Sequence, residues 1–567
     1  MNNNCRDNII SENYADFIAD YELDPMEELA KSEICYIRID PTFASVYVPQ
    51  ELVPERPLDA YGYKVFARLF GLLDVSSIED SGVIRLNNVS DMDLRGQGTL
   101  IGIVDTGIDY THKAFLNEDG TTRIVSIWDQ SVQSDAPPEG LLFGTEYTSE
   151  QINLALQNTD PKSIVPSTDD IGHGTFLAGV AAGKEDRENE FSGVVPDAEL
   201  VIVKLKPAKN RHREFYMLSQ DVICYQENDI MLGVKYLVDA AEKLDRPISI
   251  CIGLGTSQGA HDEVGALSRY LTSIVQKEGI SVAIAAGNEG ISRHHYEGNL
   301  GIGTDNETVE VNVGPNEPGL YLEIWGDNPN TFSIEMMSPG GEVIPAVVPR
   351  LNERRETGFI FEKTVVSIYF QLVGSRSGAQ LVIVKLKQPT EGIWQIKIHK
   401  INKTLDLRYN IWLPMNGFVG KETYFIKSSP NMTLTSPGNV AIPIVVTAYD
   451  NSNDSLYLNC SRGYTRLGSI APDIAAPGVN LVGPAPGNSY VTMSGTSVSA
   501  AHTAGIAAML LEWGKIRGNV SHMDGTDVKN LLIRGARRDT GKTYPSREWG
   551  YGILDIYGVY ESLRGNP

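Results

Sequence analysis

Residues 100–105 read Leu-Ile-Gly-Ile-Val-Asp, a short apolar run that ends in a carboxylate. Similar runs recur along the chain, each four to six residues long and with little polar alternation. Runs of this kind are typical of strands buried on both faces of a parallel sheet. The other runs lie at 200–203, 248–252, 282–285 and 444–448.

Stretches with apolar residues at helical spacing separate these strands. They lie at 174–183, 229–244 and 262–278, and a helix rich in small residues is predicted from Ser499 to about Trp513. Strands and helices that alternate in this way predict an α/β fold with a doubly wound, mainly parallel sheet.

Two other parts of the chain lack this alternation. From about 33 to 75 the pattern predicts a small α+β unit, with a helix over Tyr63–Leu73. From about 305 to 430, strand-like runs alternate with Gly, Pro and Asn turns, which predicts an inserted β-sandwich. The predicted domains are an amino-terminal unit at 1–75, a main domain in two parts at 76–304 and 435–567, and the sandwich at 305–434.

Length, charge and cysteines narrow the class of protein. A chain of 567 residues is too long for a single core, so two or three domains are expected. The net charge of −24 and pI near 4.8 disfavour nucleic acid and anionic membranes as partners. The five cysteines form no Cys-x-x-Cys zinc motif, and their odd number favours a reducing compartment. We see no signal peptide and no membrane span.

Three polar residues stand in contexts that suit nucleophilic catalysis. Asp105 ends a predicted central strand, where open α/β sheets bind ligands. His173 lies between two glycines at a predicted helix start, and Ser497 follows Gly-Thr in a segment rich in small residues. Each signal is weak alone, because a turn carboxylate, a buried structural histidine or a chance Gly-Thr-Ser explains it equally well; Gly255-Thr-Ser257 repeats the last one.

The order Asp, His, Ser is the order found in subtilisin. With this order the chain resembles the subtilase family in four blocks: Asp105-Thr-Gly-Ile-Asp109, Gly172-His-Gly-Thr-Phe-Leu-Ala-Gly179, Ala285-Ala-Gly-Asn-Glu-Gly290 and Gly495-Thr-Ser-Val-Ser-Ala-Ala-His502. The resemblance implies that Asp105 orients His173, that His173 is the general base and later the acid, and that Ser497 attacks a peptide carbonyl.

The same resemblance assigns residues around the substrate. It implies that the Asn288 amide and the Ser497 backbone N–H form the oxyanion hole, although Gly-Asn-Glu-Gly is also a loop signal. Two segments are expected to line the cleft, the first by pairing with an extended peptide and the second as the wall of the primary specificity pocket, with plain turn glycines as the alternative. These segments are Ile252, Gly253, Leu254 and Gly255, and Ala285, Ala286 and Gly287.

The insertion, the amino-terminal unit and the absence of a visible signal peptide resemble the clostridial spore-germination subtilases and related gut Firmicute proteins. In that subgroup the insertion is a jelly roll that braces the catalytic domain, and the cleaved propeptide can stay bound. The resemblance implies self-cleavage near Leu73 to Ser77, the chain's own propeptide as a partner, and a cytoplasmic or spore-associated protein. By the same resemblance the protein is expected to need no cofactor and no catalytic metal. A structural calcium ion is allowed, but the sequence identifies no ligands for it.

Three functions compete at this point. An active endopeptidase that cuts itself and other proteins or peptides is favoured, because a binding module has no need of all four site residues together. A regulatory or sensor subtilase that only binds is the alternative. A lipase or esterase is disfavoured because no Gly-x-Ser-x-Gly elbow surrounds Ser497.

Overall fold

A computed structural model describes residues 5–21, 34–73, 94–350, 353–374 and 376–564. Its centre is a nine-stranded sheet in which all but two of the strand pairings are parallel. The strands, in order across the sheet, are β25 (Ser455–Leu456), β24 (Ile444–Asp450), β12 (Ile280–Ala285), β10 (Ile248–Ile252), β5 (Leu100–Asp105), β8 (Glu199–Lys204), β6 (Ile124–Asp129) and β7 (Thr145–Thr148), with β26 (Ile474–Pro477) paired to β24.

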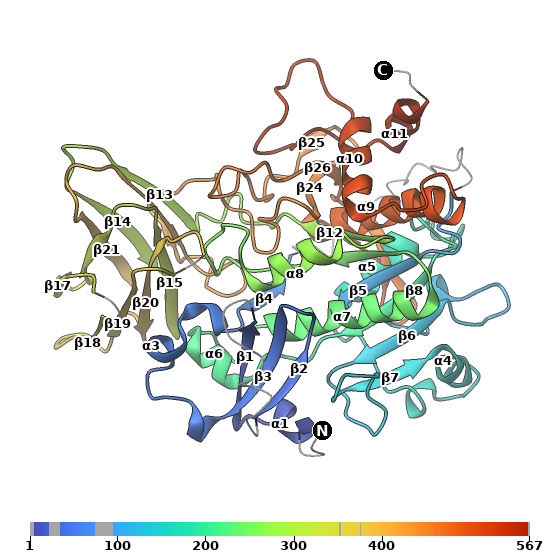
Figure 1. Cartoon of the computed structure of the whole chain (residues 1–567), viewed down its shortest axis with the longest axis horizontal. Coiled ribbons are helices and arrows are strands. Elements are labelled where there is room, and N and C mark those ends of the chain that lie inside the picture. The colour runs from blue at the N-terminus through green and yellow to red at the C-terminus, as the bar shows by residue number, and fades with distance from the viewer. Residues whose placement is uncertain (1–4, 22–33, 74–93, 351–352, 375, 565–567) are drawn as a thin grey trace.

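Helices cover both faces of this sheet, as its continuous apolar strands require (Figure 1). In β5, Ile101 and Ile103 join one core with α5 (His173–Ala182) and α9 (Thr496–Leu511). Leu100 and Val104 join the core on the opposite face, with α7 (Glu227–Leu244) and α8 (Ala266–Ile274). The predicted doubly wound sheet is therefore confirmed, although α8 is shorter than predicted and α9 begins three residues earlier, so that it includes Ser497.

The remaining elements of this part surround the sheet. They are α4 (Ser149–Leu156), α6 (Asn210–Phe215), α10 (Gly525–Gly535), α11 (Ile556–Leu563), the hairpin β27 (Leu481–Ala485) and β28 (Ser489–Met493), and the two-residue strands β9 (Tyr225–Gln226) and β11 (Leu254–Gly255).

Two antiparallel sheets lie to one side of the helix-covered sheet, on the left of Figure 1. They enclose an apolar core of their own, to which Leu322 and Ile324 contribute from one sheet and Ile396 and Ile398 from the other. The six-stranded sheet consists of β13 (His295–Leu300), β22 (Leu407–Trp412), β15 (Gly319–Gly326), β20 (Gln380–Lys387), β19 (Val365–Gln371) and β18 (Arg354–Gly358). The five-stranded sheet consists of β17 (Val343–Val347), β16 (Phe332–Met337), β21 (Gly392–Lys400), β14 (Asn306–Val313) and β23 (Tyr424–Phe425). Strand β13 thus precedes the boundary predicted at 305.

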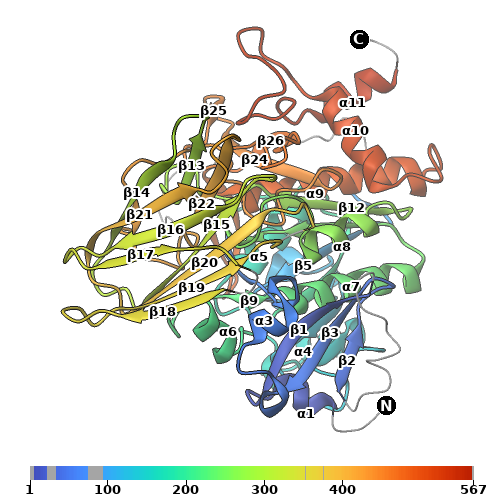
Figure 2. The same ribbon diagram turned by 60° about the vertical axis from the view of Figure 1, so that its left-hand side comes forward.

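The amino-terminal unit packs below α7 and reaches the six-stranded sheet (Figure 2). Its antiparallel sheet has the order β1 (Tyr14–Asp20), β3 (Phe43–Pro49), β2 (Cys35–Arg38), accompanied by α1 (Cys5–Ile10) and α3 (Pro57–Tyr61). The helix predicted over Tyr63–Leu73 is wrong. The chain there makes one 3-10 turn at Tyr63–Val65 and then the strand β4 (Leu69–Leu72), because distant strands supply hydrogen-bond partners that override the local helical spacing.

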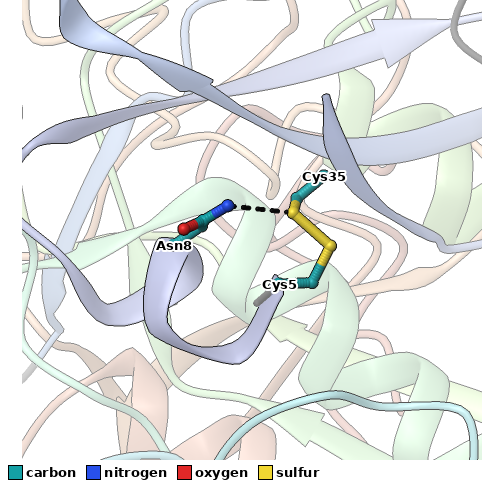
Figure 3. Close-up of a disulfide and its surroundings, with 3 residues drawn as sticks. All are labelled: Cys5, Asn8 and Cys35. Carbon is teal, nitrogen blue, oxygen red and sulfur yellow. Dashed lines mark hydrogen bonds between the residues drawn. A yellow bond between two sulfur atoms is a disulfide. The ribbon is translucent and has the colours of Figure 1, made fainter. Parts of the chain in front are cut away.

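A disulfide joins Cys5 of α1 to Cys35 of β2, and the Asn8 amide donates a hydrogen bond to Cys35 Sγ at 3.1 Å (Figure 3). Cys224, Cys251 and Cys460 are free and buried. The odd number of cysteines is therefore no evidence for a reducing compartment, because two of the five form a disulfide while three remain thiols.

Candidate active site

The sheet and two helices bring Asp105, His173 and Ser497 together. Asp105 is the last residue of β5, His173 the first of α5, and Ser497 the second of α9. The Gly-His-Gly pattern has a steric reason at Gly174, where a Cβ atom would collide with the Gly107 carbonyl of the segment that follows Asp105. The glycine lets α5 start against the end of β5.

Hydrogen bonds connect the three side chains in a line. Asp105 Oδ1 lies 2.7 Å from His173 Nδ1 and also accepts a hydrogen bond from the Thr106 backbone N–H at 2.8 Å. His173 Nε2 lies 3.2 Å from Ser497 Oγ. All three residues are at most 1% exposed. This is the geometry of a nucleophile, a base and a residue that orients the base.

Asn288 points its amide toward the carbonyl oxygen of Leu73. Its Nδ2 donates to that oxygen at 2.6 Å. Its Oδ1 accepts from the Thr496 backbone N–H at 3.2 Å and from Thr496 Oγ1 at 3.1 Å. Thr496 therefore fixes which end of the Asn288 amide faces the cleft, a positioning role that the sequence reasoning did not assign.

Strand β4 of the amino-terminal unit fills the cleft beside these residues. It pairs antiparallel with β11, Leu72 opposite Leu254 and Gly71 opposite Gly255, and on its other side with β9. The Leu73 N–H donates to the Gly253 carbonyl at 3.2 Å. The chain's own segment thus lies in the cleft as an extended peptide, with the Leu73 carbonyl at Asn288.

The predicted cleft residues divide into two groups. The backbone of Gly253, Leu254 and Gly255 contacts the β4 segment, whereas Ile252 and Ala285 end their strands with side chains inside the two cores. Gly287 and Gly255 both face Thr435: a Cβ on either would lie within 2.6 Å of Thr435 Oγ1. Ala286 accepts a hydrogen bond from the Thr435 N–H at 3.1 Å.

The Leu73 side chain packs against Gly255, because a Cβ on Gly255 would be 2.8 Å from Leu73 Cδ1. Leu73 itself is 1% exposed. Sequence reasoning missed Thr435, Tyr225 and Gln226 as cleft residues. No motif surrounds them, and only the pairing of distant segments places them here.

A buried thiol lies close to the Asp105 carboxylate. Burial, and secondarily the charge of Asp105, raises the pKa of Cys251 well above its usual range. The Cys251 thiol therefore stays neutral, and it is a packing residue and not a second nucleophile.

Among the described residues, no three His, Cys, Asp or Glu side chains gather as a group able to hold a metal ion. We assign no calcium ligands. Nor does any helix in the described ranges have the length and apolar character to cross a membrane.

Comparison with known proteins decides the family. The model of the subtilase family matches residues 96–317 and 415–552, which include all four blocks quoted above. The chain belongs to the subtilase family. It is a subtilisin-like serine peptidase, and the gap between the two matched ranges falls within the inserted antiparallel sheets.

A solved structure, the CspB protease of Clostridium perfringens, is 30% identical with a TM-score of 0.74 and covers 84% of this chain and 97% of its own. Curated relatives include a C5a peptidase of Streptococcus pyogenes, 22% identical over 484 residues, and a PII-type proteinase of Lacticaseibacillus paracasei, 22% identical over 541 residues. The matches cover 81% and 84% of this chain but only 40% and 26% of these two relatives.

Proposed function

We propose that this subtilase is an endopeptidase that hydrolyses peptide bonds with Asp105, His173 and Ser497, and that it cuts itself after Leu73. The observation that carries the proposal is the 2.6 Å hydrogen bond from Asn288 Nδ2 to the Leu73 carbonyl, made where the His173 and Ser497 side chains meet at 3.2 Å. A peptide carbonyl held by the expected oxyanion donor marks the bond to be cut.

The proton transfers follow from the hydrogen bonds. Asp105 accepts from His173 Nδ1–H, so Nε2 is the atom that takes the proton of the Ser497 hydroxyl. The Ser497 oxygen adds to the carbonyl carbon, and His173 then gives its proton to the leaving amine as the C–N bond breaks. Water, deprotonated by His173, cleaves the resulting ester and regenerates the Ser497 hydroxyl.

Negative charge develops on the carbonyl oxygen during each addition. The Asn288 amide and the Ser497 backbone N–H are the donors we assign to it. Two hydrogen bonds from Thr496 hold the amide in place beforehand, so that no reorganisation is needed when the charge appears.

The amino-terminal unit acts as the first substrate and as a propeptide. The Leu73 carbonyl belongs to the Leu73–Asp74 bond, at the start of the predicted cut region, and residues 74–77 lie outside the described residues. Main-chain pairing of β4 with β11 and β9 holds the segment as an added strand. The same pairing makes the cleaved unit an inhibitor of its own cleft.

Buried charges support retention of this unit after cleavage. Asp16 of β1, fully buried, lies 2.5 Å from Lys209 Nζ and accepts from Gln226 Nε2 at 2.8 Å. Arg68, just before β4, makes a bidentate contact with Glu227, including a 2.9 Å bond from Nε. These pairs fix how the unit docks, because removal of one partner would leave the other charge buried and unpaired.

The inserted sheets act as a jelly-roll-like brace. Tyr63 donates its hydroxyl to Glu323 Oε1 at 2.5 Å, and Glu323 lies on β15 of the six-stranded sheet. Gln371 of β19 contacts both the Tyr63 N–H and the Leu58 carbonyl. The insertion thus holds the amino-terminal unit from a second side.

A fluorophosphonate probe tests the proposal directly, since it labels only an activated serine. We expect labelling of the wild type at Ser497 and none in Ser497→Ala, whose turnover should fall by roughly a millionfold, the figure known for the nucleophile of subtilisin. A folded wild-type protein that is not labelled and has the same intact mass as Ser497→Ala, with no self-cleavage, would instead be the non-catalytic sensor.

A further inference from the structure

The third residue before the proposed cut is a glycine that a turn of the inserted region covers. Counting back from the Leu73–Asp74 bond, the chain reads Leu73, Leu72, Gly71, Phe70. The covering segment, residues 415–418, follows β22 of the six-stranded sheet and is called the 415–418 turn below. It lines one hollow together with Gly71, Leu72 and Leu73.

The turn crowds the space that a side chain on Gly71 would occupy. A Cβ atom there would lie 2.9 Å from ring atom Cε1 of Phe418 and 3.4 Å from the sulfur and the terminal methyl of Met415. Carbon atoms in proteins pack at about 3.5–4.0 Å, so the ring would have to move. Phe418 is 7% and Met415 2% exposed, and both belong to the core that also contains α5 and α9.

Hydrogen bonds hold the 415–418 turn against the oxyanion segment. The Asn416 backbone N–H donates to Glu289 Oε1 at 2.9 Å, and Asn416 Nδ2 donates to the Asn288 carbonyl at 3.2 Å. Glu289, only 3% exposed, lies 2.7 Å from His294 Nδ1 through its other oxygen. The Phe418 N–H closes the turn on the Met415 carbonyl at 3.0 Å. Moving the Phe418 ring by shifting the turn would break the hydrogen bonds that Asn416 makes to Glu289 and Asn288.

We infer that the 415–418 turn makes this peptidase selective for glycine at the third residue before the cut. Its substrates are then extended peptides with a glycine two residues ahead of a leucine-like residue, of which the chain's own Phe-Gly-Leu-Leu is the first example. This specificity resides in the insertion and not in the segments that carry Asp105, His173 or Ser497. The inference rests on the proposed endopeptidase function.

Competing peptides test the selectivity. Two peptides that contain Phe-Gly-Leu-Leu or Phe-Ala-Leu-Leu before an otherwise identical sequence are mixed with the full chain, and their products are resolved by mass. The ratio of the two kcat/KM values does not depend on how much cleft the chain's own segment occupies. We expect the glycine peptide to be favoured about tenfold or more, the usual cost of one extra methyl in a packed site.

Removing the ring supplies the decisive comparison. Phe418→Ala should bring the ratio close to one, whereas Phe361→Ala, which removes an 88% exposed ring of the same insertion, should leave it unchanged. In the full chain, Gly71→Ala should slow the appearance of the cleaved form, and adding Phe418→Ala should restore it. The peptide competition, in which Gly71 of the chain is unchanged, separates substrate selectivity from a merely structural role of Gly71.

The outcomes distinguish the glycine selectivity from the endopeptidase activity. Equal cleavage of both peptides by the wild type, or an unchanged preference in Phe418→Ala, overturns the selectivity and leaves the endopeptidase in place. Cleavage of neither peptide, with no labelling by the fluorophosphonate and no self-cleavage of the wild type by intact mass, overturns the proposed function itself.

Discussion

Asn288 donates a 2.6 Å hydrogen bond to the carbonyl oxygen of Leu73, a residue 215 positions earlier in the chain. The donor belongs to the family segment Ala-Ala-Gly-Asn-Glu-Gly, and the acceptor is the last described residue before 94. The contact joins the proposed catalytic apparatus to one particular peptide bond, so it allows the site of self-cleavage to be predicted to the residue.

We expect the wild type to cut itself between Leu73 and Asp74. Intact-mass measurement should show a new amino terminus at Asp74, while Ser497→Ala should remain at the full 62.1 kDa because it lacks the nucleophile. Equal intact masses for the two proteins, or a new terminus beyond Asp105, would show that the zymogen interpretation is wrong.

Asn288→Ala should lower kcat by roughly a hundred- to a thousandfold with little change in KM, because the amide contacts charge that exists only in the transition state. Thr496→Val, which removes the hydroxyl bonded to Asn288 Oδ1, should lower kcat in the same direction by less. Steady-state kinetics on one peptide check both variants. An effect confined to KM would assign Asn288 to substrate binding.

Asp16→Asn should release the cleaved amino-terminal unit. The change leaves the Lys209 ammonium, 4% exposed, without its buried carboxylate partner. Breaking a buried ion pair from one side costs about 3–5 kcal/mol, so retention should weaken by about a hundredfold or more. Native size-exclusion chromatography after processing measures the co-eluting fragment that ends at Leu73.

Asp7→Asn is the matched control, since Asp7 is an exposed carboxylate in α1 of the same unit. If both variants retain the fragment as the wild type does, the Asp16–Lys209 pair does not hold the unit in place.

Acid should destabilise the fold through His502, which lies in α9 five residues after Ser497. Burial lowers the pKa of His502 to about 4, below the value of about 6.5 expected in the unfolded chain. Between these two pH values the unfolded chain therefore binds a proton at His502 that the folded protein does not bind. The stability that the protein has above pH 6.5 is lost as the pH falls toward 4.

The variant His502→Leu removes this contribution. Melting temperatures measured from pH 8 to 4 should fall less steeply below pH 6.5 in His502→Leu than in the wild type, with the two curves parallel above pH 7. Parallel curves over the whole range would mean that His502 takes up its proton equally in both states.

The helices and sheet strands were largely predictable, because periodicity is a local property. The runs at 100–105, 248–252 and 282–285 became β5, β10 and β12, and the amphipathic stretch at 229–244 became most of α7. The helix predicted over Tyr63–Leu73 was wrong although its apolar spacing fits a helix. Gly71 and Leu72 instead pair as a strand with Leu254–Gly255, more than 180 residues away.

By itself, the sequence determined the family and the parallel sheet, and it singled out Asp105, His173, Ser497 and Asn288 as the proposed site residues, because these reside in short motifs and in local patterns of apolar residues. Only the tertiary structure decided which peptide bond faces Asn288, that Phe418 closes over Gly71, that Asp16 pairs with Lys209, and that Cys5 bonds Cys35. Each of these joins residues from segments that no local pattern connects. The disulfide forms within the amino-terminal unit, and the other three contacts form where that unit packs against the main domain and the segment that follows β22.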